Sequence, residues 1–303
     1  MNLRFLETFI WVAKLRSFSL AATKLNTTQA NVSARISSLE RDLGVRLFER
    51  NGREVSLTAQ GKYALDSAEE LVRVATEFQK KVCGQEAIRG NVRIGITDTI
   101  ALSILPLLIE RLRTSYPNVT VELTADTSLN LSKKLLDNQI EMGFLMGPVL
   151  GCGIVNKELI NLASVWVASP DFELPEGQID VAALTKFPIL SFPSDSKPYE
   201  SMRGYFRRDI FKGIAISTSN SVTTILSLVT NGMGIAALPA VLVQEQLAAK
   251  KLRRIDVVQH FPPLLFHVSY FDAPELMLPP IIANMACEVA AKYCKGQNSH
   301  YAW

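Results

Sequence analysis

The sequence predicts a mixed α/β protein of more than one domain: a small helical domain comes first, and a larger domain of alternating strands and helices follows. Three observations predict this class. The chain has 303 residues, which is more than one hydrophobic core usually spans. Hydrophobic residues make up 48% and charged residues 20%, as in folded proteins. The apolar period changes from helical to alternating near Gly90.

Three helices are predicted at the N-terminus. Apolar residues recur at helical spacing over residues 3–14. Ser17 then offers a hydroxyl cap to a helix of two turns, and Thr28 caps a third helix that ends at Gly44. A short helix, a tight turn and a longer helix form the helix-turn-helix pattern, whose last helix enters the major groove of DNA.

A β-hairpin is predicted directly after these helices. Residues 46–50 and 54–57 alternate around Asn51-Gly52, a strong hairpin dipeptide. This hairpin is the wing, with Arg50 and Arg53 at its tip. The pattern predicts a winged helix-turn-helix DNA-binding domain over residues 1–58.

Charge supports the same interpretation. Residues 1–60 hold nine Lys and Arg against five acids, a net charge of +4, whereas the whole chain carries +3. A cationic first fifth suggests that only this part meets a polyanion, although a solvated helical surface can carry the same excess.

The predicted groove face of the third helix is small, because alanines and serines lie opposite its buried apolar stripe. Gln29 is the best candidate for a base contact, since glutamine can pair with adenine through two hydrogen bonds. We expect modest direct readout, supplemented by DNA shape and by phosphate contacts of the wing. The predicted DNA-binding residues are Thr28, Gln29, Ala30, Asn31, Ser33, Ala34, Arg35, Arg50 and Arg53.

A long linker helix and a hinge are predicted over residues 59–89. Small and apolar residues recur at alternating spacings of four and three, which predicts pairing between two copies of the helix. The alternative is a helix that packs on its own domain. The predicted dimer seam consists of Ala64, Ala68, Leu71, Ala75, Phe78 and Val82.

Strands and helices alternate from residue 90 onward, which predicts parallel sheets flanked by helices. The predicted elements are strands at 92–96, 119–123, 142–146 and 264–270, and helices at 103–116, 129–136 and 280–293. Residues 225–243 are the most membrane-like stretch, but Gly232 and Pro239 interrupt it. We interpret it as a helix, a glycine turn and a buried strand.

Several motifs resemble the LysR-type transcriptional regulators. They are Ala21-Ala22, residues 28–36, Leu39-Glu40, residues 43–50 and residues 57–61, with weaker matches at residues 90–96, Tyr116-Pro117 and residues 232–239. The sequence departs from the family at Ala30, where proline is usual, and at Ala34, where arginine is frequent.

This resemblance implies a two-lobed, periplasmic-binding-protein-like α/β effector domain over residues 90–303. Lobe I is expected at about 90–163 and 268–303, and lobe II at about 164–267. The resemblance also implies a homodimer made by the linker helix or a homotetramer on double-stranded promoter or operator DNA. RNA polymerase is left open as a further partner.

By resemblance, a small-molecule effector lies between the lobes. Hydroxyls and N–H groups at helix starts suit a carboxylate, whereas Asp98 would repel an anion and could hold an ammonium group. A carboxylate and an amino acid therefore both stay open. The predicted effector-binding residues are Asp98, Thr99, Ile100, Thr127, Ser128, Pro193, Ser194, Ser219 and Asn220.

Other function classes lack sequence support. No nucleophile-elbow, phosphate-loop or metal-ligand pattern is present, so we expect neither an enzyme nor a cofactor nor a metal. A solute-binding transport protein would not carry a DNA reader. A cysteine redox switch is the alternative control mechanism, but Cys287 and Cys294 would lie about 10 Å apart along one helix.

A cytoplasmic location is expected. The four cysteines show no CxxC spacing or disulfide-scaffold density, which favours a reducing compartment. Charged residues such as Arg4 and Glu7 interrupt the N-terminal apolar residues, so the start of the chain does not resemble a signal peptide.

Overall fold

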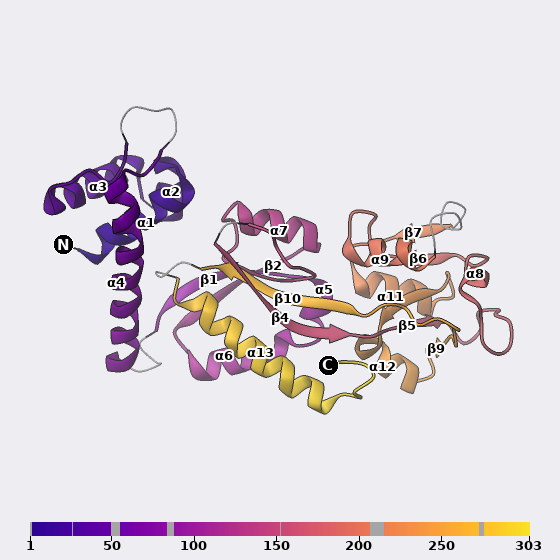
Figure 1. The fold of residues 1–303 in the computed structure, drawn as a ribbon. Helices are drawn as coiled ribbons and strands as arrows, with labels where there is room; N and C mark the ends of the chain where they lie inside the picture. The colour runs from indigo at the N-terminus through magenta and orange to yellow at the C-terminus, as the bar shows by residue number, and fades with distance from the viewer. Residues whose placement is uncertain are drawn as a thin grey trace. The chain divides into compact units, whose positions relative to one another are not determined.

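The computed structural model describes residues 2–25, 27–49, 55–83, 88–151, 153–206, 215–272 and 276–303. The chain divides into two compact units (Figure 1): unit 1 comprises Met1–Ile88 and Asp272–Met277, and unit 2 comprises Arg89–Phe271 and Leu278–Trp303. Within the described ranges, no helix has the length and apolar character needed to cross a membrane.

Unit 1 contains the three predicted short helices and the long one: α1 (Leu3–Leu15), α2 (Phe18–Lys24), α3 (Gln29–Leu43) and α4 (Ala59–Cys83). The predicted caps are confirmed, since Ser17 Oγ accepts the N–H of Leu20 and Thr28 Oγ1 accepts the N–H of Asn31, both at 3.2 Å. Gly44 ends α3 at a left-handed φ of 70°, which glycine adopts without strain.

The base of the predicted wing is present next to α3. Phe48 and Leu57 form an antiparallel bridge. The Glu40 carboxylate of α3 accepts the N–H groups of Leu47 and Phe48 at 2.8 and 3.3 Å, which ties the hairpin to that helix. The tip, residues 50–54, lies outside the described residues.

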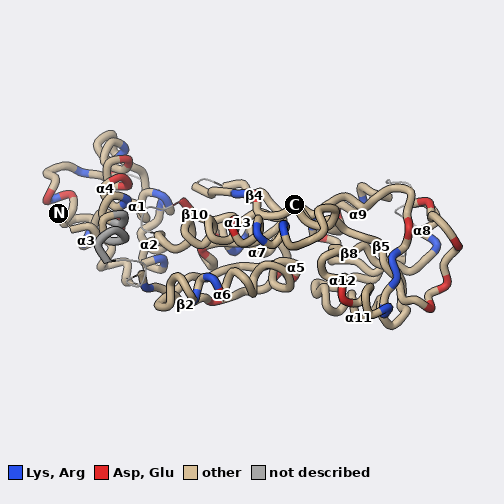
Figure 2. The backbone as a smooth tube through the Cα atoms, turned by 90° about the horizontal axis from the view of Figure 1, so that it is seen from below, with Lys and Arg blue, Asp and Glu red and all other residues tan. Residues whose placement is uncertain are grey.

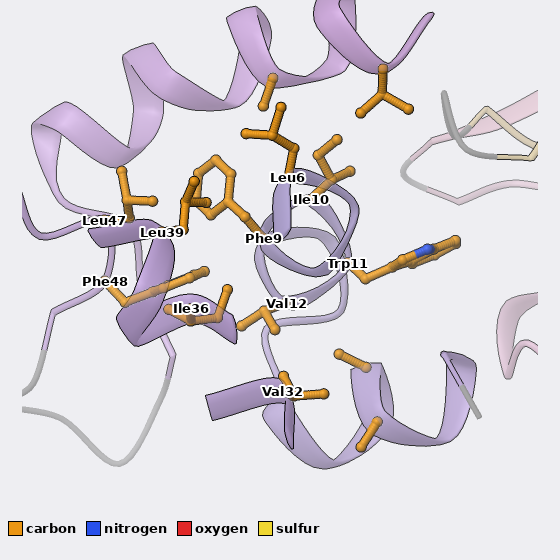
Figure 3. Close-up of a cluster of buried hydrophobic side chains, with 14 residues drawn as sticks. Leu6, Phe9, Ile10, Trp11, Val12, Val32, Ile36, Leu39, Leu47 and Phe48 are labelled. Atoms are coloured by element: carbon orange, nitrogen blue, oxygen red, sulfur yellow. The ribbon is translucent and has the colours of Figure 1, made fainter. Parts of the chain in front are cut away.

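An apolar core holds α1, α3 and the wing base together (Figure 3). The ring of Phe9 meets the ring of Phe48 edge to face, with centroids 5.6 Å apart. Trp11 is also buried, and Lys24 Nζ lies 4.8 Å from its ring centroid. Each such large side chain contributes roughly 1.5–3 kcal/mol by leaving water. This core thus holds α3 against α1 and the wing base.

Unit 2 begins with a five-stranded sheet of order β2-β1-β3-β10-β4. Its strands are β1 (Gly90–Ile96), β2 (Val119–Ala125), β3 (Met142–Leu145), β4 (Ile154–Leu162) and β10 (Leu264–Phe271). β1 pairs in parallel with β2 and β3, but β10 runs antiparallel to β3 and β4. The prediction of parallel sheets is wrong for that part, because β10 enters from the other lobe and not through a crossover helix.

This sheet and its helices form lobe I. The helices are α5 (Asp98–Ala101), α6 (Leu105–Ser115), α7 (Ser128–Leu136) and α13 (Leu278–Gly296). Figure 1 shows α7 on one side of the sheet and α6 with α13 on the other. β10 belongs to the sheet from Leu264 onward, so the predicted lobe boundary at residue 268 falls inside a strand and needs correction.

Lobe II is built on two smaller sheets, of order β8-β5-β9 and β6-β7. Its strands are β5 (Ser164–Ala168), β6 (Ile189–Ser191), β7 (Ile216–Thr218), β8 (Ala236–Pro239) and β9 (Arg253–Arg254), and its helices are α8 (Val181–Leu184), α9 (Lys197–Tyr205), α11 (Val222–Thr230) and α12 (Ala240–Ala248). The membrane-like stretch forms α11, a turn and β8, as predicted. A Cβ at Gly234 in that turn would lie 2.4 Å from the Pro188 carbonyl oxygen, so only glycine fits.

Acidic residues gather before α8 in lobe II (Figure 2), namely Asp171, Glu173, Glu176 and Asp180. Arg253 of the neighbouring strand Arg253–Arg254 lies beside them, since its Nη2 donates to the Phe172 carbonyl, so this surface carries charges of both signs.

The C-terminal tail pairs with β4 beside the first crossing between the lobes. Asn161 and Trp303 exchange two backbone hydrogen bonds of 2.9 and 3.1 Å, and Ala163 N–H donates to the Tyr301 carbonyl at 2.9 Å. The Tyr301 side chain packs against the core of lobe II. The tail therefore touches both lobes.

Candidate functional site

The outer face of α3 is exposed and small, as predicted. Val32, Ile36 and Leu39 are buried on the opposite side, which fixes the orientation of the helix. The exposed positions from its first two turns are Gln29, Ala30, Asn31, Ser33 and Ala34. Because most of these side chains are small, this face of α3 permits a close approach to base edges and phosphates.

Two of the predicted contact residues also have partners inside unit 1. The Asn31 side-chain amide donates to Thr27 Oγ1 at 3.1 Å, which steadies the start of α3. Arg35 is half-buried, and its Nη1 donates to Thr8 Oγ1 of α1 at 3.4 Å. In this structure Arg35 therefore leans toward α1, whereas Gln29 is exposed at the helix start.

A carboxylate lies near Arg35 on α1. Partial burial raises the pKa of Glu7 above its ordinary value, and the charges of Arg4 and Arg35 oppose that rise only in part.

Arg50 and Arg53, the predicted wing contacts, lie outside the described residues.

The linker helix α4 has two apolar faces. Ala68 and Val72 are 3% and 2% exposed and pack against the core of unit 1. Leu71 and Phe78 stay 46% and 65% exposed on another face. The predicted seam therefore needs correction, because Ala68 packs on its own unit as the alternative interpretation held.

The remaining seam residues divide in the same way. Ala64 is half-buried against the core of unit 1, and Ala75 is half-buried. The side chain of Val82 lies outside the described part. Val74, which the sequence analysis missed, is 50% exposed beside Leu71 and Phe78.

A small cavity of about 40 Å³ lies between the lobes of unit 2. Six of the predicted effector residues line it: Asp98, Thr99, Thr127, Ser128, Pro193 and Asn220. Ile100 is 1% exposed and belongs to the core, so its prediction as a contact is wrong. Thr97 and Phe192, which adjoin predicted residues, also line it. The sequence analysis missed Asp126, Met146, Ser196, Pro198 and Phe266, which complete the lining.

A second, larger cavity of about 280 Å³ shares Ser128, Met146 and Ser196 with the first. Ser194, predicted for the effector site, lines this one. It also carries two cationic side chains, Lys197 and Arg203, on α9, and Lys197 forms an ion pair with Glu200 at 3.1 Å. The two cavities thus bring acidic and basic groups near one another.

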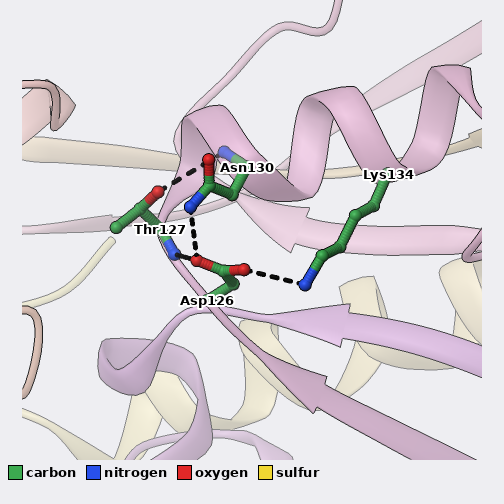
Figure 4. Close-up of polar contacts among 4 residues, drawn as sticks. All are labelled: Asp126, Thr127, Asn130 and Lys134. Carbon is green, nitrogen blue, oxygen red and sulfur yellow. Dashed lines mark hydrogen bonds and ion pairs between the residues drawn. The ribbon is translucent and has the colours of Figure 1, made fainter.

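Asp126 anchors the start of α7 (Figure 4). Its Oδ1 accepts the N–H of Thr127 and the amide of Asn130, and its Oδ2 accepts Lys134 Nζ, all at 2.8 Å. Partial burial alone would raise the pKa of Asp126, but these hydrogen bonds and the charge of Lys134 outweigh it and lower the pKa. Asp126 is therefore an ionised structural group.

The hydroxyls predicted to bind an anion have structural partners. Thr127 Oγ1 caps α7 through the N–H of Asn130 at 3.4 Å, and Ser128 Oγ accepts the N–H of Met146 at 3.0 Å. Ser219 Oγ accepts the N–H of Ser221 at 3.2 Å, and Ser219 does not line either cavity.

Asp98 makes a contact across the cavity. Its Oδ2 accepts the backbone N–H of Val222, the first residue of α11, at 3.1 Å. The carboxylate is thus paired with a helix start, which the sequence could not reveal because 124 positions separate the two residues.

A helix-turn-helix unit with an exposed small-residue reading helix, together with a two-lobed α/β unit with a lined cavity, defines a DNA-binding regulator with an effector-binding domain. Residues 3–62 match the family model described as bacterial regulatory helix-turn-helix protein, lysR family, and residues 85–271 match the LysR substrate binding domain. The chain belongs to the LysR family of transcriptional regulators.

Individual relatives agree with this assignment. The HTH-type transcriptional regulator CzcR of Bacillus cereus is 30% identical over 239 residues, 79% of this chain and 80% of CzcR. The uncharacterised HTH-type transcriptional regulator YeiE of Escherichia coli (strain K12) is 29% identical over 258 residues, 85% of this chain and 87% of YeiE.

The fold is also shared with solved structures. Full-length LysG from Corynebacterium glutamicum, with bound effector Arg, matches with a TM-score of 0.59 at 18% identity. The match covers 96% of this chain and 99% of the LysG chain. At this identity the likeness concerns the fold alone.

Proposed function

We propose that this regulator binds specific DNA sequences through α3 and is controlled by a small molecule held between the lobes of unit 2. The observation that carries the proposal is the pair of adjoining cavities at the starts of α7, α9 and α11. Ligands of open α/β folds usually bind at such strand ends and helix starts.

The charges of the cavities favour an amino acid as effector. On the larger cavity Lys197 and Arg203 suit a carboxylate, although Asp195 and Glu200 line it too and Glu200 pairs with Lys197. Asp98 on the smaller cavity suits an ammonium group. LysG, which shares the fold, has Arg, an amino acid, as its bound effector.

The regulator acts as a homodimer or homotetramer in this proposal. The exposed side chains of Leu71, Val74 and Phe78 on α4 support pairing with a second copy. RNA polymerase stays a predicted partner to which no surface is assigned.

The cysteine redox switch receives less support. Cys287 and Cys294 lie on α13, seven positions and thus about 10 Å apart along its axis. Partial burial raises the pKa of both thiols, which keeps them protonated and weakly nucleophilic. Cys152 and the side chain of Cys83 lie outside the described residues.

DNA reading is tested by replacing Gln29. Gln29→Ala should lower the affinity for the native operator by roughly 5-fold to 150-fold and relax the preference at one adenine, because one paired contact is worth about 1–3 kcal/mol. Competition gel shifts with operator variants measure this. Gln178→Ala, the same change at an exposed glutamine of unit 2, is the control. Unchanged preference in Gln29→Ala would remove this residue from base readout.

Effector control is tested by a thermal-shift screen of amino acids and small carboxylates on the full-length protein. A ligand that binds only the folded state must raise Tm. Asn220 is exposed and lines the small cavity, so Asn220→Trp should fill the cavity and abolish the shift. A shift that survives in Asn220→Trp would place the ligand outside the small cavity.

A further inference from the structure

One hydrogen bond crosses the cleft of unit 2. It joins the Asp98 carboxylate of α5, in lobe I, to the N–H of Val222 at the start of α11, in lobe II, at 3.1 Å. The first N–H groups of a helix have no partner within the helix and carry partial positive charge. Asp98 therefore occupies a position where an external anion would otherwise bind.

Helix α11 depends on this distant residue for a cap. Its own N-cap residue, Ser221, accepts no hydrogen bond through its side chain from a backbone N–H of the first turn. The Ser221 hydroxyl instead lies 2.8 Å from Thr223 Oγ1. By contrast, α7 and α9 are capped by their own Thr127 and Ser196. A cap supplied from the opposite lobe thus distinguishes α11 from these two helices.

We propose that Asp98 is a cross-lobe cap that determines effector specificity. It links lobe I to the start of α11 and prevents any carboxylate of the effector from binding at that helix start. An effector carboxylate can bind at α11 only by displacing Asp98, so it is directed to Lys197 and Arg203 instead. This inference rests on the effector site proposed above.

Chemical rescue tests the proposal on the full-length protein. Asp98→Ala removes the carboxylate and should lower Tm by about 5 °C, since hydrogen bonds to charged groups are among the stronger ones. Acetate, exchanged for chloride at constant ionic strength, should then bind at the vacated helix start and restore part of the loss. Wild type should show no such specific response.

Two further variants test whether the response to acetate depends on the loss of the Asp98 side chain or is a general effect of acetate on stability. Asp98→Asn keeps an acceptor for the Val222 N–H and fills the space, so acetate should not raise its Tm beyond the wild-type response. Asp180→Ala removes an exposed carboxylate from the N-cap of α8, where it makes no side-chain cap bond, and should behave as wild type. If Asp98→Ala does not fold, Asp98→Ser takes its place, because its shorter hydroxyl reaches less far.

Hydrogen exchange reports directly on the donor. The peptide that contains the Val222 amide should exchange about tenfold faster or more in Asp98→Ala, and near the wild-type rate in Asp98→Asn. Acetate should slow the exchange in Asp98→Ala. Equal exchange in wild type and Asp98→Ala, or equal acetate responses in all variants, would overturn the cross-lobe cap.

Gel shifts on the same preparations keep the two proposals apart. If wild type does not bind DNA, the proposed function is wrong, whereas exchange at Val222 still decides the role of Asp98. If every variant binds DNA but acetate does not distinguish them, only the role of Asp98 is overturned.

Discussion

A single buried histidine in lobe I has an environment that opposes its charge. His267 on β10 is 6% exposed, and its Nδ1 meets no hydrogen-bond partner within the described part of the chain. Burial lowers the pKa of His267, and the negative charge of Glu158, its neighbour on β4, opposes this only in part. The folded protein therefore holds this imidazole neutral near pH 7.

This environment predicts a loss of stability in mild acid. Above the unfolded-state pKa of about 6.5, both states are neutral at this residue. As the pH falls below that value, the unfolded state takes up a proton first, so the free energy of unfolding decreases until the lower folded pKa is reached. His267→Gln should flatten this decrease in urea titrations between about pH 7 and 5.5. His260→Gln, at an exposed histidine, should keep the wild-type slope.

Single residues also show where sequence reasoning stops. Ser17, Thr28 and Gly44 could be assigned because a cap and its helix are neighbours in sequence. The contact between Asp98 and Val222 could not, because it depends on how two lobes close. The region of the effector site was therefore predictable, but the roles of its polar side chains were not.

At the scale of elements, α4 carries two apolar faces that its heptad pattern could not separate. Its first half packs through Ala68 and Val72 on unit 1, whereas Leu71, Val74 and Phe78 remain exposed. Both faces repeat at nearly the same spacing, so periodicity alone assigns both to one seam. Similarly, alternation predicted four strands of lobe I but missed β4. It also predicted parallel pairing where β10 in lobe I, and β5 beside β8 and β9 in lobe II, pair antiparallel, because pairing over long sequence separations decides strand direction.

The exposed face of α4 predicts which substitution would break the proposed oligomer. Phe78→Glu should shift the protein toward monomer, because a charge would be buried in a pair of apolar helices. Sedimentation equilibrium measures the change. Arg73→Ala removes an exposed ion pair with Glu70 on the same helix and should leave the assembly intact. An unchanged dimer in Phe78→Glu would exclude this face as the dimer contact.

At the scale of unit 2, the chain crosses between the lobes from β4 to β5 and from β9 to β10, and further contacts also join the lobes. Besides the Asp98 contact, Tyr301 packs on the core of lobe II while the tail backbone pairs with β4. Gln244 of α12 also donates to Gln297 Oε1, just beyond α13, at 2.9 Å. These contacts restrict how lobe II can turn, so ligand control of the cleft must work against them.

The pairing of the tail with β4 predicts that removing the tail backbone and removing the Trp303 side chain change amide exchange differently. Removal of residues 301–303 should speed amide exchange at Asn161 and Ala163, since the Trp303 and Tyr301 carbonyls accept those N–H groups at 2.9 Å. Trp303→Ala should leave the exchange slow, because the Trp303 side chain is exposed and only its backbone pairs. If the truncation changed exchange no more than Trp303→Ala did, the tail would not restrain the crossing. If it also raised the response of the cleft to an effector, the restraint would act on ligand binding, since looser lobes close at less cost around a ligand.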